Sequence, residues 1–163
     1  MGREIRRVPP NWEHPKTQVI RFHLGILQYV EEDKPMHDRR YDDEIEDWIK
    51  GRAEWLAKPQ HDCTYEEWAG KAPDPDYYRP WKDEEATWYQ LWQNVSEGSP
   101  VSPPFETLDE LSAYLAEHGD SWDQSRGHGG WGIERARRFC ECGWAPSFIT
   151  SPAGVEEGKL SSL

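Results

Sequence analysis

The residues best suited to catalysis follow one another between positions 120 and 132, in a stretch rich in glycine. His128 can act as a base, Asp120 and Asp123 supply carboxylates, and Arg126 supplies a cation. No nucleophile elbow, phosphate-binding loop or dinucleotide fingerprint accompanies them. The sequence therefore favours a polar loop between two helices, and an enzymatic or small-ligand site in the Asp120–Gly132 loop is the alternative.

Four residues of the kind that bind zinc occur as two pairs, His61 with Cys63 and Cys140 with Cys142. Structural zinc sites usually separate the members of a pair by two to four residues, whereas a single residue separates them here. Three cysteines are also too few and too odd in number for a disulfide framework. We expect free thiols in a reducing cytoplasm and neither a metal nor any other cofactor.

Carboxylates are the most abundant chemical groups of the chain, and the densest patch lies in one short segment. On a helix, residues four apart share a face, so Asp43 would lie beside Asp47 and Asp42 beside Glu46. Such a row can imitate successive phosphates or pair with a line of arginines and lysines, although a solvated helix face is the alternative. The acidic residues predicted to bind a partner are Asp38, Asp42, Asp43, Glu46, Asp47, Glu84 and Glu85.

The net charge of -12 over 163 residues is concentrated in the middle of the chain. Residues 23–125 hold nine bases and 25 acids, whereas residues 1–22 hold five bases and two acids. An acidic surface repels nucleic acid and anionic membranes and attracts basic partners. We therefore expect a basic protein partner, with no direct nucleic-acid binding and no membrane association.

Tryptophan provides the means of folding such a charged chain. Ile, Leu, Val and Phe total only 26 residues, which together with the charge is typical of disorder, but there are 10 Trp. One buried Trp removes roughly 200 Å² from water. The tryptophans expected in the core are Trp48, Trp55, Trp88, Trp92 and Trp131.

The elements that position these residues can be read from the periodicity of the apolar side chains. Period-two alternation predicts strands over residues 3–8 and 17–30, with a bend or bulge at Gly25. Helical spacing begins near Arg40, and Thr64 with Glu67 and Thr107 with Glu110 form capping boxes. Further helices are expected over residues 83–95 and from Ile133 to Gly143, followed by an extended segment over residues 144–151.

These elements predict an α+β fold of about four helices, with a small β-sheet formed by N-terminal strands and a C-terminal extended segment. We expect a single acidic domain over residues 1–152 and a polar tail over residues 153–163. Arg3, Arg6, Arg7 and Arg21 lie on the predicted strands, where they can neutralise internal acids or give the molecule a dipole.

Four stretches resemble a group of small uncharacterised proteins encoded by tailed bacteriophages. They are Gly2–Pro15 (GREIRRVPPNWEHP), Tyr77–Trp81 (YYRPW), Ser96–Phe105 (SEGSPVSPPF) and Gly143–Ser147 (GWAPS). The resemblance supplies no catalytic residues, because the group has no assigned activity. It implies a phage accessory protein that acts in the cytoplasm of a bacterial host.

Charge and resemblance together lead to one expected function. The protein is expected to inhibit a host nucleic-acid-handling or defence complex, in the manner of an anti-CRISPR protein, without being an enzyme. The acids would steer it to its partner, and an exposed Trp81 beside a proline-rich loop would supply an aromatic contact. A virion or assembly component is the other possibility that the sequence leaves open.

Overall fold

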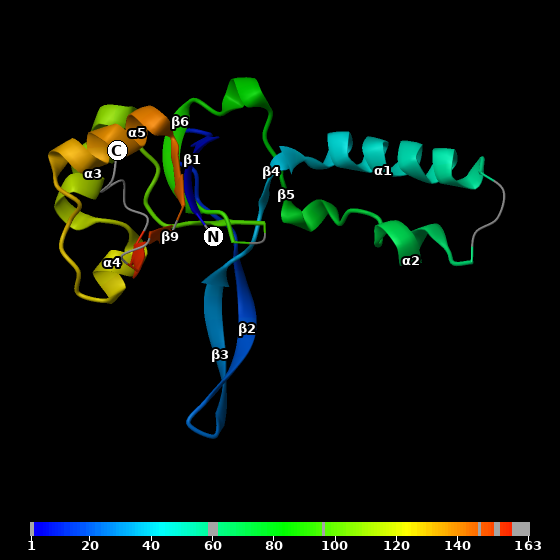
Figure 1. Cartoon of the computed structure of the whole chain (residues 1–163), viewed down its shortest axis with the longest axis horizontal. Coiled ribbons are helices and arrows are strands. Elements are labelled where there is room, and N and C mark those ends of the chain that lie inside the picture. Colours follow the sequence, from blue (N-terminus) through cyan, green and yellow to red (C-terminus); the bar gives the residue numbers. More distant parts are fainter. Residues whose placement is uncertain (1, 59–61, 96, 147, 152–153, 158–163) are drawn as a thin grey trace. The chain divides into compact units, whose positions relative to one another are not determined.

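The computed structural model describes residues 2–58, 62–95, 97–146, 148–151 and 154–157 (Figure 1). They form two compact units, of which the first comprises residues 1–35 and 81–163 and the second residues 36–80. The sequence predicted one domain over residues 1–152, whereas the structure places residues 36–80 in a compact unit of their own. Residues 36–80 lie within the acidic middle of the chain, so the charge pattern does not mark where this unit begins and ends.

The first unit is built on a sheet of four strands in the order β7-β6-β1-β8, of which β6 and β1 are labelled in Figure 1. Its strand β1 (Gly2–Val8) pairs antiparallel with β6 (Trp88–Gln93) on one side and with β8 (Trp144–Pro146) on the other. The short β7 (Ser99–Pro100) extends the β6 edge. An N-terminal strand and a C-terminal extended segment therefore share one sheet, and the predicted α+β class is confirmed.

The helix predicted over residues 83–95 is wrong. Only residues 83–85 are helical, as the 3-10 turn η2 (Asp83–Glu85), and the rest of the apolar stripe is strand β6. Three successive residues of β6, Gln90 to Trp92, are buried because both faces of the strand are covered. A strand buried on both faces loses the period-two pattern, and the spacing of its tryptophans and leucine then resembles a helix.

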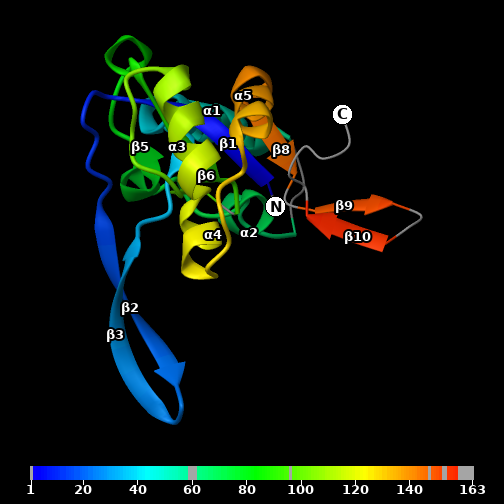
Figure 2. The ribbon, with the colours of Figure 1, turned by 90° about the vertical axis from the view of Figure 1, so that its left-hand side faces the viewer.

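Two helices, α3 (Leu108–His118) and α5 (Ile133–Cys142), contact each other in the first unit (Figure 2). The capping box of Thr107 and Glu110 begins α3 as predicted, and Gly143, with φ 73°, ends α5. The two helices pack into one apolar core together with Leu91 of β6 and Trp131. Each fully buried leucine or phenylalanine in such a core stabilises the fold by about 1.5–3 kcal/mol.

A long β-hairpin occupies the segment that was predicted as one strand with a bend. Strand β2 (Lys16–His23) pairs antiparallel with β3 (Ile26–Asp33) along its whole length. Leu24 and Gly25 join them with φ 49° and 82°, the two positive values that a type I′ turn requires. Among the described strands these two pair only with each other, and the hairpin extends away from the sheet (Figures 1 and 2).

The second unit consists mainly of two helices connected by residues 57–64. The first, α1 (Tyr41–Leu56), follows β4 (His37–Arg40), which pairs in parallel with β5 (Tyr78–Arg79). The second, α2 (Tyr65–Ala69), begins with the predicted capping box, and η1 (Pro75–Tyr77) leads into β5. No helix in the described ranges has both the length and the apolar composition needed to cross a bilayer.

The aromatic residues of the second unit gather around Tyr65, which is buried. Its ring lies 5.2 Å from that of Trp48, 6.0 Å from Trp55 and 5.9 Å from Trp68, measured between centroids. Gly51 permits the approach of α2, because a Cβ at this position would lie 2.5 Å from the Tyr65 hydroxyl. Trp48 and Trp55 therefore join the two helices, but both stay half-buried and α1 has no fully buried residue, so they do not form the core that the sequence predicted.

Two segments expected to be irregular contain regular structure. A short helix, α4 (Ser121–Ser125), lies within the predicted 120–132 loop. In the predicted tail, residues 154–157 form β10 (Gly154–Glu157), which pairs antiparallel with β9 (Phe148–Ser151). Residues 153 and 158–163 of that tail lie outside the described residues.

The core of the first unit leads to a test with two neighbouring glycines. A Cβ at Gly130 would lie 2.5 Å from the backbone carbonyl carbon of Glu117 and closer still to the oxygen of Ala116, whereas a Cβ at Gly129 meets nothing within 4 Å. Gly130→Ala is expected to lower the free energy of unfolding by about 1–3 kcal/mol, since backbone has to move. Gly129→Ala is the control, with an expected change within about 0.5 kcal/mol. Equal denaturant midpoints for the two variants would contradict this packing.

Candidate functional site

Helix α1 presents a row of carboxylates to solvent. Asp42, Asp43, Glu46 and Asp47 are all exposed, and a helical repeat places them on the side of α1 opposite to Trp48 and Trp55. We call these four residues the α1 acidic face. Asp42 pairs with Arg40, the residue that precedes the helix, whereas Asp43, Glu46 and Asp47 form no ion pair with any other residue that the structure describes.

The remaining predicted acids are placed differently. Asp38 belongs to β4 and lies 3.7 Å from the Arg79 guanidinium of the neighbouring strand β5, measured from Oδ1 to Nε. Glu84 and Glu85 are exposed in the first unit, and the Glu85 carboxylate accepts a hydrogen bond from the Lys82 backbone N–H at 2.7 Å. The structure therefore brings four of the seven predicted acids together on one helix.

Trp81, expected to be an exposed contact, is instead buried with 4% of its surface exposed. Its ring packs edge-on against Trp12 at a centroid distance of 4.5 Å. Nearby in the same unit, the Arg6 guanidinium lies 4.5 Å above the ring of Trp92, and His14 packs edge-on against that ring at 4.9 Å. The prolines beside Trp81 indicate a loop. They do not indicate that Trp81 is buried against Trp12.

The exposed aromatic and apolar residues lie at positions that sequence reasoning missed. Trp68 of α2 is 67% exposed, because a helix of five residues cannot cover both sides of so large a ring. The hairpin carries the largest exposed apolar surface in the described part of the chain, with Phe22 73% and Tyr29 75% exposed. The alternation over residues 17–30 predicts one strand with a bend at Gly25, and it does not indicate whether other parts of the chain cover the apolar side chains.

The catalytic-looking groups between residues 120 and 132 are used to hold the first unit together. Asp120 is fully buried, pairs with Arg3 of β1, and accepts hydrogen bonds at 2.9 Å from the backbone N–H groups of Trp122 and Asp123. Asp123 is 2% exposed and accepts the indole hydrogen bond of Trp131 at 2.6 Å. These carboxylates cap α4 and fix a core tryptophan, so they are not available to a bound substrate.

His128 is the exposed member of this group. Its Nδ1 lies 3.7 Å from a carboxylate oxygen of Asp123, and its backbone N–H donates to the Asp123 carbonyl at 2.8 Å. The Arg126 guanidinium lies 5.2 Å from the centre of the Trp122 ring. The segment thus contains a histidine and an acid in proximity.

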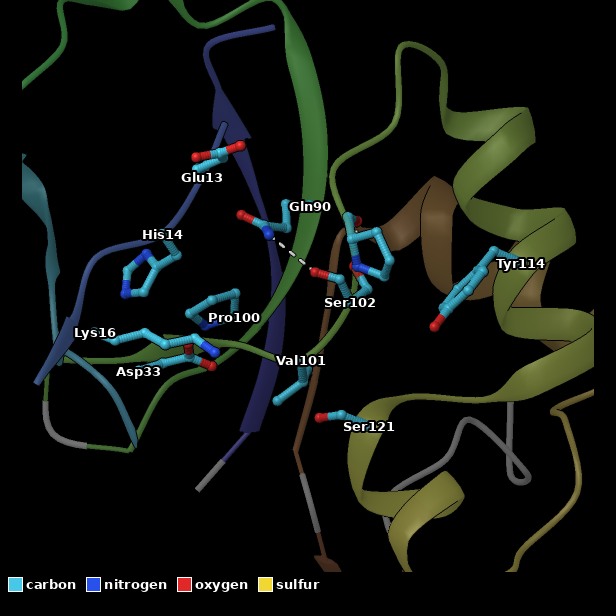
Figure 3. Close-up of a pocket in the computed structure, with 11 residues that line it drawn as sticks. Glu13, His14, Lys16, Asp33, Gln90, Pro100, Val101, Ser102, Tyr114 and Ser121 are labelled. Carbon is cyan, nitrogen blue, oxygen red and sulfur yellow. Dashed lines mark hydrogen bonds between the residues drawn. The ribbon is translucent and has the colours of Figure 1, made fainter. Parts of the chain in front are cut away.

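A polar hollow of about 490 Å³ lies between the hairpin base, β6 and α3 in the first unit (Figure 3). Glu13, Lys16 and Asp33 bring charges of both signs to its wall, and Gln90 donates to the Ser102 carbonyl at 2.9 Å. His14 also lines it, yet both ring nitrogens are engaged. Nε2 lies 2.7 Å from the Lys34 carbonyl and Nδ1 lies 3.3 Å from the indole nitrogen of Trp12. Because both ring nitrogens of His14 are engaged, the ring has a structural role and is not free to act as a base.

The two pairs of zinc-type residues do not come together as a site in the described residues. No group of three or more His, Cys, Asp or Glu side chains able to hold a metal ion occurs among them, and His61 lies outside the described residues. Cys63 and Cys142 are exposed free thiols, and Cys140 is a buried one that belongs to the apolar core.

Comparison of the chain with models of protein families, with curated proteins and with solved structures finds no match.

The three thiols are expected to differ in reactivity. Burial, reinforced by the negative charges of Asp109 and Glu141, raises the pKa of Cys140 to about 11, so this thiol stays protonated near neutral pH. Only the thiolate is nucleophilic. Iodoacetamide at pH 8 is expected to modify Cys63 and Cys142 in the folded protein and Cys140 only after unfolding, as judged by peptide mass spectrometry. Modification of Cys140 at the same rate as the other two would contradict its burial.

The His14 ring makes the stability of the first unit depend on pH. Desolvation, aided by the charge of Arg6, lowers the pKa of His14 below its ordinary value of 6.5, despite the opposing effects of the Lys34 carbonyl and Asp33. The unfolded chain then binds this proton more readily, so stability is retained above pH 6.5 and lost as the pH falls below that value. The free energy of unfolding between pH 7.5 and 5.5 is expected to change less in His14→Gln than in the original chain. Parallel curves would exclude this contribution.

Proposed function

We propose that this protein is a non-enzymatic inhibitor, of the kind that phages encode, which binds a basic surface of a host nucleic-acid-handling or defence complex. The observation that carries the proposal is the α1 acidic face, a row of exposed carboxylates that folding does not require. On this proposal the protein acts in the bacterial cytoplasm and competes with nucleic acid for a cationic groove, as anti-CRISPR inhibitors do.

The energetics of α1 support a role in binding. Asp42 with Glu46 and Asp43 with Asp47 are like-charge pairs four residues apart, and each such pair destabilises a helix by about 0.2–0.5 kcal/mol. The helix dipole favours acids only within the first turn, which accounts for Asp42 and Asp43 but not for Glu46 and Asp47. Glu46 and Asp47 therefore add like-charge repulsion without a gain from the dipole, which is expected of residues that serve a partner.

The spacing of the α1 acidic face suits a partner groove that binds nucleic acid. Acids one helical turn apart are separated by about 6 Å along the axis, and they form a line of negative charge. A groove lined with arginine and lysine attracts such a line at long range and pairs with it at contact. In the same unit, Trp68 is 67% exposed and takes the place that the sequence had assigned to Trp81 as the aromatic contact.

The proposal is tested by reversing the charge of the α1 acidic face. Affinity capture from bacterial lysates containing CRISPR–Cas effectors identifies the target, which is then purified and titrated with the inhibitor. Asp42→Lys/Asp43→Lys/Glu46→Lys is expected to slow association by at least tenfold, because electrostatic steering is lost. Association of the original chain is expected to slow steeply between 50 and 200 mM salt, and excess duplex DNA is expected to compete.

A matched control separates the local effect from that of net charge. Glu106, Glu117 and Glu141 are exposed acids of the first unit, and changing them to lysine alters the net charge by the same amount. This control is expected to retain most of the association rate and all of the inhibition. Equal losses in the two triple variants, or capture that is insensitive to salt, would overturn the proposal.

A further inference from the structure

The hairpin of β2 and β3, which we call the arm, has one face that no other part of the described chain covers. Directly paired residues lie on the same side of a sheet, so the pairs Ile20 with Tyr29 and Phe22 with Leu27 form a continuous apolar patch. The four side chains are 59%, 75%, 73% and 66% exposed, in that order. We call these four residues the arm face.

The opposite side of the arm has a different character. It carries Arg21, which pairs with Glu32 at 2.6 Å, and the apolar pair of Val19, partly buried, and Val30, 37% exposed; Ile26 lies on the same side beside the turn. On the arm face, every residue of β2 that shares the side of Ile20 is exposed, down to Lys16 at the base. An exposed apolar patch on a two-stranded ribbon is a site of association.

From this arrangement we infer that the arm face is the interface of a symmetric dimer, in which the arm of a second copy packs against it. A two-fold axis along the arm would place β2 of one copy over β3 of the other. Ile20 would then face Tyr29 of the second copy, and Phe22 would face Leu27. In each half of the interface, every apolar residue of one copy thus contacts an apolar residue of the other copy.

The charges at the base of the arm fit the same two-fold arrangement. On the side of the arm face, β2 carries Lys16 and β3 carries Glu31 and Asp33, with Lys16 directly across from Asp33. Superposing β2 on the second copy's β3 would bring each Lys16 over the other copy's Glu31 and Asp33. Neither Lys16 nor Glu31 forms an ion pair within the residues described, so both are available for this contact.

The area of the patch is sufficient for a specific dimer. The arm face together with Leu24 at the tip, which is 88% exposed, offers roughly 600 Å² of apolar surface, with each aromatic ring contributing about 150 Å². Two copies would bury about 1,200 Å², the lower end of the range for stable interfaces.

The test compares two adjacent residues with similar exposure on opposite sides of β3. Leu27 belongs to the arm face and is 66% exposed, whereas Ile26 faces away and is 61% exposed. Sedimentation equilibrium of the full chain between 1 and 200 µM is expected to show a dimer. Leu27→Asp is expected to raise the dissociation constant at least tenfold, and Ile26→Asp by less than threefold. Circular dichroism checks that both variants remain folded.

A charge exchange tests the two-fold geometry independently of the apolar contacts. Lys16→Glu is expected to weaken the dimer several-fold, and adding Asp33→Lys to the same chain is expected to restore it, because Lys16 and Asp33 face each other across the two-fold axis and the pair then re-forms with its signs reversed. A chain that stays monomeric at 200 µM, equal effects of Leu27→Asp and Ile26→Asp, or no restoration by the double variant would each overturn the inference. Binding of a monomeric arm to lipid vesicles or to the inhibited target would likewise exclude the dimer.

This inference is independent of the proposed function, because the α1 acidic face and the arm face share no residue. Reversing Asp42, Asp43 and Glu46 is expected to leave the sedimentation profile unchanged. Conversely, Leu27→Asp is expected to leave the association rate of a single inhibitor chain with its target unchanged. The sedimentation and association experiments can therefore contradict one proposal without affecting the other.

Discussion

The pairing of β1 between β6 and β8 is the constraint on which the first unit depends. The strand is held on both sides, and the backbone N–H of Ile5 also donates to the Gly143 carbonyl at 2.8 Å, where α5 ends. From the same strand, Arg3 reaches the buried carboxylate of Asp120 at the start of α4. Removing one partner of such a buried ion pair typically costs about 3–5 kcal/mol, so the sheet and the helical layer are stabilised together.

The arginines of β1 stabilise the first unit through ion pairs, hydrogen bonds and contacts with aromatic rings. Arg6 is 6% exposed, and it donates to the Glu4 carboxylate at 2.6 Å and to the Glu97 carbonyl at 3.1 Å while lying over the ring of Trp92. The sequence left open whether these bases neutralise internal acids or create a dipole. For Arg3 and Arg6 the first alternative is confirmed by their pairing with Asp120 and Glu4, whereas Asp43, Glu46 and Asp47 of α1 are among the exposed acids with no ion pair in the described part of the chain.

The parts of the fold that could be predicted are those determined by local chemistry. The capping boxes at Thr64 and Thr107 and the glycine after α5 mark helix ends through contacts a few residues apart, and all three are present. Strand β6 was mistaken for a helix, because burial on both faces is a tertiary effect that removes the alternation. For the same reason, the burial of Trp81 against Trp12 could not be read from the residues beside it.

The candidate site was only partly predictable. Clustering of the α1 acids follows from helical spacing alone, whereas the placement of Glu84 and Glu85 in a different unit follows from the division of the chain at residues 36–80, which composition does not reveal. The exposure of the arm was missed because alternating apolar residues indicate a strand but do not indicate whether a core covers it. Whether the apolar side chains of the arm are exposed or covered thus depends on tertiary contacts that a single sequence does not specify.

The central position of β1 has a consequence for the order in which the protein forms. The ribosome makes β1 before its neighbours, yet Arg3 pairs with Gln93 in β6 and with Ala145 in β8, about 90 and 140 residues later in the chain. Contacts of such high sequence separation slow folding, because the intervening chain must be ordered first. The pairings within the arm and within the second unit span fewer residues, so we expect the four-stranded sheet to close after they form, although its first strand is made first.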